Sequence, residues 1–131
     1  MSVVVGYVPT PEGEAALEQA IAQARTRDAR LVVVNSSRGD ALVDERFAQP
    51  EQVTALEKRL SSARVDHLLL QSMRGWDPAE EVLDAAEQHR ADLIVIGLRR
   101  RSPVGKLIMG STAQRILLEA PCPVLAVKAA H

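Results

Sequence analysis

The stretch from Gly97 to Thr112 holds the residue types in this chain that are best suited to chemistry. It contains four cations, namely Arg99, Arg100, Arg101 and Lys106. It then reaches Gly110, Ser111 and Thr112 at the predicted start of a helix, where unpaired N–H groups and roughly half a positive charge suit a phosphate. Gly110 lets the backbone approach an oxyanion closely, and the two hydroxyl groups can donate to it. The segment therefore predicts a site for an anion, with phosphate as the best fit.

A purely structural interpretation of the same residues stays open. In that interpretation Ser111 caps its own helix, in a capping box that continues to Gln114, and the arginines form a solvated loop. The segment is not a Walker phosphate loop, because Leu107 follows the Gly-Lys pair and Arg100 occupies the place of the first glycine. No Gly-x-Gly-x-x-Gly follows the first aliphatic run, which argues against an ordinary NAD site.

Five short aliphatic runs must position this segment. They span Val3–Tyr7, Leu31–Val34, Val65–Ser72, Leu93–Ile96 and Pro123–Lys128. The runs are largely continuous and do not alternate with polar residues, which is typical of strands buried on both faces. We interpret residues 36–50, which include Gly39 and Pro50, as a surface connection.

Stretches with helical spacing separate the runs, and two of them carry clear start signals. Thr10 is the predicted N-cap of the first, with Pro11 at the first helical position. Asp77 is the predicted N-cap of the third, followed by Pro78, and Glu80 can reach back to the N–H of the cap.

The second and fourth helical stretches are predicted from their apolar faces. In the second, the inward residues are Val53, Leu56, Leu60 and Ala63, and those turned to water are Glu57, Lys58 and Arg59. In the fourth, which Pro121 ends, the inward residues are Ile116, Leu117 and Ala120.

Strands that alternate with helices predict βαβ units and therefore a parallel sheet with helices on both faces. The predicted fold is a single Rossmann-like α/β domain with a five-stranded parallel sheet. In such open sheets a ligand lies outside the carboxyl ends of the strands, where the winding direction reverses. The loops after Tyr7, Val34 and Ile96 are therefore expected to build the site.

Composition excludes several classes of protein. The chain has 131 residues and a net charge of −1, so no overall attraction to nucleic acid or to anionic lipid is expected. It has few aromatic residues (Tyr7, Phe47 and Trp76), which argues against base stacking on exposed rings. No apolar run has the length of a membrane span, and Met1–Gly6 does not resemble a signal peptide. We therefore expect a cytoplasmic protein with no nucleic-acid or membrane partner.

No set of residues predicts a metal centre or catalysis. Cys122 is interpreted as a small buried side chain, and no Cys/His cluster has zinc spacing. His67 and His89 have no Ser or Asp partner nearby in sequence, and Glu80 and Glu81 fit a helix start better than a catalytic pair. The loop holds no acidic residue to bind Mg²⁺ or to orient water, so at most a slow ATPase is expected.

The motif around Gly97 resembles that of the universal stress proteins. Nucleotide-binding members of this family carry Gly-x2-Gly-x9-Gly-[Ser/Thr] between the fourth strand and the last helix. Gly97 and the pair Gly110-Ser111 match this spacing, and Arg100 stands where the middle glycine is expected. Asp92–Gly97 is similar to the family's fourth strand, and Gln114–Val127 is similar to its closing helix and strand.

The resemblance covers residues 1–131 as one universal stress protein domain, with a fold like that of the adenine nucleotide alpha hydrolases. It implies a cleft for ATP, or for ADP or AMP, with Mg²⁺, and a role in regulating the stress response. Ile96 and Gly97 would line the ribose and phosphate side. The residues that would hold phosphate oxygens are Gly110, Ser111 and Thr112, and Gly6 to Val8 would face the adenine.

Two positions depart from the family pattern. Val8 stands where the family usually has an acidic residue, so a contact to the nucleoside there is made by backbone or is lost. Arg100, beside Arg99, can pair with phosphate through its guanidinium or can fill the site itself. An alternative function follows, in which the domain binds no nucleotide and acts through partner contacts. The family also implies a homodimer formed through the last strand, Val124 to Val127, whose apolar edge invites pairing.

Overall fold

The structure, a computed structural model, describes residues 1–35, 50–71, 77–98 and 110–129. Its core is one parallel sheet of five strands in the order β3-β2-β1-β4-β5. The strands are β1 (Ser2–Tyr7), β2 (Arg30–Asn35), β3 (His67–Gln71), β4 (Ala91–Leu98) and β5 (Val124–Lys128). The helices are α1 (Pro11–Arg27), α3 (Pro50–Ser62), α4 (Pro78–Gln88) and α5 (Ser111–Glu119). The predicted fold class is thus confirmed.

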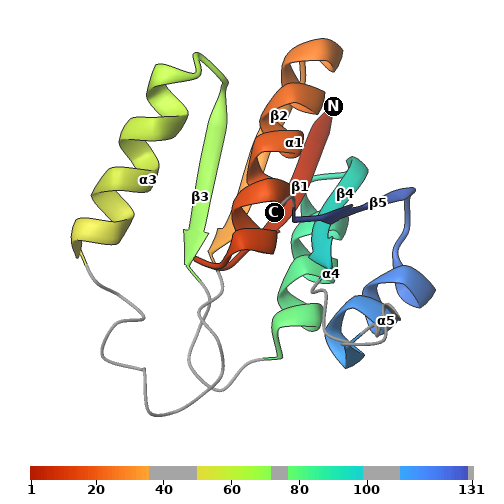
Figure 1. The fold of residues 1–131 in the computed structure, drawn as a ribbon. Helices are drawn as coiled ribbons and strands as arrows, with labels where there is room; N and C mark the ends of the chain where they lie inside the picture. The colour runs from red at the N-terminus through yellow and green to blue at the C-terminus, as the bar shows by residue number, and fades with distance from the viewer. Residues whose placement is uncertain (36–49, 72–76, 99–109, 130–131) are drawn as a thin grey trace.

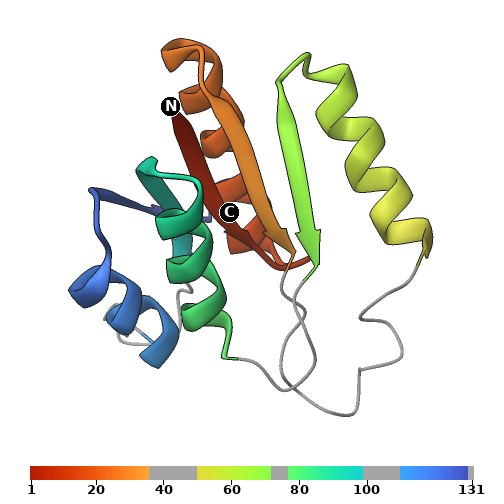
Figure 2. The ribbon, with the colours of Figure 1, turned by 180° about the vertical axis from the view of Figure 1, so that it is seen from behind.

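Helices cover both faces of the sheet, as Figures 1 and 2 show from opposite sides. Alternate residues of β1 enter two separate cores: Val3 and Val5 pack among residues of α1 and α3, and Val4 packs among residues of α4 and α5. All three valines are fully buried. A strand with an apolar core on each side has no solvated face, which explains why its sequence is a continuous aliphatic run.

Two of the predicted helix starts are confirmed by the hydrogen bonds of their N-cap side chains. The Thr10 hydroxyl accepts a hydrogen bond from the Gly13 N–H at 3.1 Å, and Pro11 opens α1. At the start of α4, one carboxylate oxygen of Asp77 accepts from the Ala79 N–H at 3.1 Å. Each cap satisfies one of the N–H groups that a helix leaves unpaired in its first turn.

The predicted start and inward face of the last helix are partly wrong. Gly110, not Ser111, is the N-cap of α5, and no side chain among the described residues caps it. Leu117, which was expected to face inward, is 39% exposed, because α5 covers the sheet with a narrow stripe around Ile116. The neighbouring Leu118 is 80% exposed.

Three further details complete the fold. Arg59 of α3 was expected to face water, but it contacts α1 through Glu14 and Glu18.

The predicted surface connection 36–50 falls almost wholly outside the described residues. Among the helices that the structure describes, none has the length and apolar character needed to cross a membrane.

Candidate functional site

The sheet changes its winding direction between β1 and β4. The chain places β2 and β3 on one side of β1, and β4 and β5 on the other. In the described strands, the pairing of β1 with β4 ends at Val5 and Val95, whereas β1 stays paired with β2 as far as Tyr7, and β4 with β5 as far as Leu98. The two central strands thus separate at their carboxyl ends, which is where open α/β sheets bind ligands.

Four of the predicted site residues lie at this separation. Gly6 and Ile96 come directly after the last β1–β4 pair, and Gly97 and Val8 follow them. The Val8 carbonyl accepts a hydrogen bond from the Thr10 N–H at 2.8 Å, which closes a tight turn into α1. The structure therefore brings these residues together from sequence positions about ninety apart, as the topology predicts.

Gly97 is required by the fold. A Cβ atom added to it would lie 2.3 Å from the carbonyl oxygen of Glu12 and 2.7 Å from the carbonyl carbon. Both contacts are to backbone in the first turn of α1, which cannot move aside as a side chain can. Gly97 thus allows α1 to begin directly against the end of β4, a role that its place in the loop motif did not reveal.

Gly110 is in a different situation. Its backbone is extended, with φ −75° and ψ 167°, so its conformation does not require glycine. Among the described residues, no atom lies within 4 Å of a Cβ atom added there. Ser111 and Thr112, which follow, are exposed. Among the described residues, the absent side chain at Gly110 therefore leaves open space in front of the first N–H groups of α5.

The start of α5 also differs from those of α1 and α4 in charge. The first turn of α1 contains Glu12 and Glu14, and that of α4 contains Glu80 and Glu81, whereas the first turn of α5 holds no acidic residue. Acidic side chains near a helix N-terminus offset its positive end. Within the described residues, α5 therefore offers an uncapped, uncompensated positive end that can accept an anion.

The position of α5 puts this end of the helix on the side of the sheet where open α/β folds bind ligands. Ile116 packs in one cluster with Ile96 and Leu98 from the carboxyl half of β4. Figure 1 shows α5 at the same lower end of the sheet as the tips of β1 and β2. Arg99 and Arg100, the other predicted site residues, lie outside the described residues.

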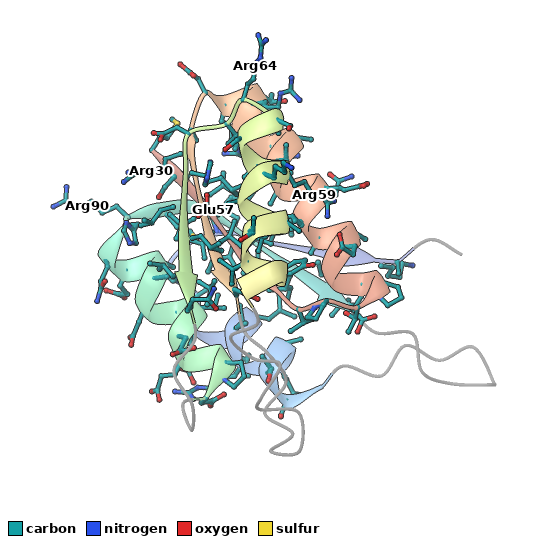
Figure 3. All side chains as sticks on the ribbon, turned by 90° about the vertical axis from the view of Figure 1, so that its left-hand side faces the viewer. Arg30, Glu57, Arg59, Arg64 and Arg90 are labelled. Atoms are coloured by element: carbon teal, nitrogen blue, oxygen red, sulfur yellow. The ribbon has the colours of Figure 1, made fainter. Side chains whose placement is uncertain are left out.

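A separate cavity of about 190 Å³ lies on the other face, between α1 and α3. The Tyr7 hydroxyl donates to one oxygen of Glu14 at 2.5 Å, and Arg59 donates to the other; Figure 3 shows Arg59 reaching from α3 toward α1. Partial burial acts to raise the pKa of Glu14, but the bonds from Arg59 and Tyr7 outweigh it and lower that pKa. Burial and the bond to Glu14 raise the pKa of Tyr7. No local pattern predicts this network, because Arg59 lies 45 residues from Glu14 in the chain.

The contacts of His67 and the burial of Cys122 are typical of residues with a structural role. One ring nitrogen of His67 contacts the Val65 carbonyl at 2.9 Å, and the other contacts Glu57 at 3.0 Å; the Glu57 contact first, and then the carbonyl, raise the pKa of His67. Cys122 is half-buried, and burial raises the pKa of its thiol, which disfavours the reactive thiolate. No group of three or more metal-ligating side chains forms within the described part of the chain.

The fold and this site define a doubly wound α/β domain whose candidate ligand site lies where β1 and β4 separate. The family model of the universal stress proteins matches residues 1–128, and the chain belongs to that family. A universal stress protein of Mycolicibacterium smegmatis is 49% identical over 126 residues, which cover 96% of both chains.

Solved structures agree with this assignment. A universal stress protein from Archaeoglobus fulgidus has a TM-score of 0.79 at 30% identity and covers 98% of each chain. Another structure, of the universal stress protein from Archaeoglobus fulgidus in complex with dAMP, has a TM-score of 0.67 at 25% identity, again over 98% of each chain. The ligand in that complex is an adenine nucleotide.

Proposed function

We propose that this chain binds an adenine nucleotide, with ATP as the leading candidate and ADP or AMP as the others, and acts as a cytoplasmic regulator of the stress response. The observation that carries the proposal is the start of α5, which has no acidic residue in its first turn and no side-chain cap among the described residues, in a sheet whose strands β1 and β4 separate at their carboxyl ends. The dAMP complex of the relative from Archaeoglobus fulgidus supports the choice of nucleotide.

The phosphate groups are assigned to the start of α5. Backbone N–H groups and the hydroxyls of Ser111 and Thr112 donate to phosphate oxygens, and the open space at Gly110 admits them. Arg99 and Arg100 add cationic partners, since a guanidinium pairs with phosphate through two parallel bonds. Mg²⁺ accompanies ATP and offsets part of its negative charge.

The nucleoside is assigned to the separated strand ends. In this proposal Ile96 and Gly97 contact the ribose side and Gly6 to Val8 contact the adenine; the β1–β4 pairing, which ends just before Gly6 and Ile96, supports this assignment. Val8 has no polar side chain, so the base is recognised there by backbone groups and by apolar contact. The proposed role is binding without dedicated turnover, because no acidic residue lies in the first turn of α5 to orient an attacking water.

Calorimetric titration tests the proposal. We expect saturable binding of ATP with Mg²⁺, and of ADP or AMP, and weaker binding of GTP. Ser111→Ala should weaken ATP binding several-fold, whereas the matched variant Ser62→Ala, which alters an exposed serine at the end of α3, should bind like the native chain. Absence of any saturable heat at millimolar nucleotide would reject the proposed function.

We further propose a homodimer paired through β5. This strand lies at the edge of the sheet, where among the described strands it pairs with β4 alone, and Val124, Leu125 and Val127 are only half-buried. An apolar strand edge of this kind favours pairing with a second copy. Light scattering should give twice the chain mass, and a monomer mass at high concentration would contradict the pairing.

The alternative function, a partner-binding module without nucleotide, is favoured by one observation. Leu118 is 80% exposed beside Leu117 on α5, and large exposed apolar groups in a row are typical of contact surfaces. If the native chain binds no nucleotide and Arg100→Gly creates binding, then Arg100 fills the site, and this alternative replaces the proposed function.

A further inference from the structure

The helix α5 has little apolar contact to hold it in place. Within α5, all of which the structure describes, only Ile116 is buried. Leu117 and Leu118 are exposed. Ala113 and Ala120 pack, partly buried, against the same cluster as Ile116. One large and two small apolar side chains constrain the rotation and tilt of the helix only weakly, so a polar contact can set the direction in which the start of α5 points.

Arg115 supplies that contact. Its guanidinium donates to Asp77 at 2.8 Å and to Glu80 at 3.1 Å, both at the start of α4, and to Glu119 of α5 itself at 3.3 Å. The hydrogen bond to Glu80 first, and then the charge of Glu119, raise the pKa of Arg115. Three donor nitrogens held by three carboxylates fix the plane of the guanidinium, which a single surface ion pair does not.

The partner helix is firmly anchored. Five residues of α4 are buried, namely Ala79, Val82, Leu83, Ala85 and Ala86. Asp77 serves both helices: one carboxylate oxygen caps α4 through the Ala79 N–H, and the other accepts from Arg115 of α5. Arg115, in the middle of α5, thus ties this helix to the start of a well-buried helix.

We propose that Arg115 is a positioning residue for the phosphate site, since it fixes the orientation of the α5 start through Asp77 and Glu80. The inference rests on the proposed function, because the groups it positions are those of Gly110, Ser111 and Thr112. Arg115 lies one helical turn beyond Ser111, so its side chain acts on the ligand through the helix backbone.

The first test compares two arginine variants with the same change in net charge. Arg115→Met should weaken nucleotide binding about tenfold and speed amide hydrogen exchange in α5. Arg30→Met is the control, because Arg30 makes one exposed ion pair with a described residue, Asp66 at 3.7 Å. Figure 3 shows Arg30 at the end of the sheet away from α5. This control should match the native chain in both measurements, and Arg115→Lys should lie between, since an ammonium cannot reproduce the fork of the guanidinium.

A second variant separates positioning from simple attraction between charges. Asp77→Asn keeps a good N-cap for α4 but weakens the contact to Arg115. If Arg115 acted only as a positive charge near the phosphate, removing the negative charge of Asp77 would tighten nucleotide binding. Positioning predicts the opposite sign, a several-fold loss, with little further loss when Asp77→Asn is combined with Arg115→Met.

The outcomes distinguish this inference from the proposed function. If the native chain binds nucleotide and Arg115→Met binds equally well, or if Asp77→Asn binds more tightly, the positioning role is wrong and the proposed function stands. If the native chain binds no nucleotide, the proposed function fails, and hydrogen exchange decides whether Arg115 orders α5. Unchanged exchange in Arg115→Met would then overturn the inference as well.

Discussion

Gly97 and Gly110 bracket the same loop, but the structure treats them in opposite ways. At Gly97 an added Cβ atom would meet the Glu12 backbone at 2.3 Å, and at Gly110 it would meet no described atom within 4 Å. The first glycine is thus demanded by the packing of α1 on β4. The second is demanded by nothing in the described fold, which is the situation that the proposed phosphate site explains. In that proposal, one glycine of the motif serves the packing of the fold and the other serves the ligand.

The largest effect is expected from Gly97→Ala. The new methyl group must push the first turn of α1 away from β4, which should cost about 3 kcal/mol of unfolding free energy. Thermal unfolding followed by circular dichroism should show a melting temperature lower by roughly 10 °C. Gly110→Ala is the matched control and should lose less than about 1 kcal/mol. Equal losses in the two variants would break the comparison.

Gly110→Asp should sharpen the comparison by giving α5 the kind of start that α4 has. The new carboxylate can cap the helix and complement its positive end, so the protein should keep or slightly gain stability, by up to about 0.5 kcal/mol. The same charge should repel phosphate and weaken nucleotide binding at least about a hundredfold, or about 2.7 kcal/mol. Calorimetric titration and thermal unfolding of one preparation measure both quantities. Retained affinity would place the phosphate elsewhere.

Capping variants should show a smaller difference between the same two helix starts. Asp77→Ala removes a cap and the contact to Arg115, and it should cost about 1 kcal/mol. Ser111→Ala should leave the unfolding free energy unchanged within about 0.3 kcal/mol, because Ser111 is exposed and is not the cap of α5. Urea unfolding measures both. A comparable loss in Ser111→Ala would restore the structural interpretation of that serine.

The smallest effect concerns a region that should not respond to nucleotide, the contact of His67 on β3 with Glu57 on α3. The pKa of His67 is raised in the folded chain, so its stabilisation is complete below the ordinary value of 6.5 and is lost as the pH rises through the raised value. This contact should contribute about 0.5 kcal/mol to the unfolding free energy, because Glu57 is half-exposed and its charge is screened by solvent. Glu57→Gln should remove this pH-dependent part of the unfolding free energy, with and without ATP. If Glu57→Gln leaves the pH dependence of the unfolding free energy unchanged, the His67–Glu57 contact does not contribute in this way.

Local signals in the sequence predicted most of the fold. Continuous aliphatic runs predicted five strands. The expected burial on both faces holds for the central strands β1, β2 and β4, whereas β3 and β5 are only half-buried because they lie at the edges of the sheet. Thr10 and Asp77 were identifiable as caps because a cap and its N–H partner are two or three residues apart. The Gly97 and Gly110-Ser111 spacing led to the family, which the match over residues 1–128 confirms.

Features that depend on distant neighbours escaped prediction. Leu117 fits the helical period of α5 but is 39% exposed, because no element covers that side of α5 in the described chain. Ser111 has the residue type of a cap, and only the backbone shows that Gly110 takes the position. The partners of Arg115 at the start of α4 are 35 and 38 residues away, so no local pattern could reveal them.

The most direct test of the account follows the backbone N–H signals of an isotope-labelled chain by NMR while ATP is added. The account predicts that the signals of Ser111 and Thr112 move saturably, while those of Leu31 and Ala63, whose N–H groups donate to the Asp66 and Arg59 carbonyls, stay in place. Signals of Ser111 and Thr112 that remain fixed at millimolar ATP would contradict the claim that the start of α5 binds phosphate.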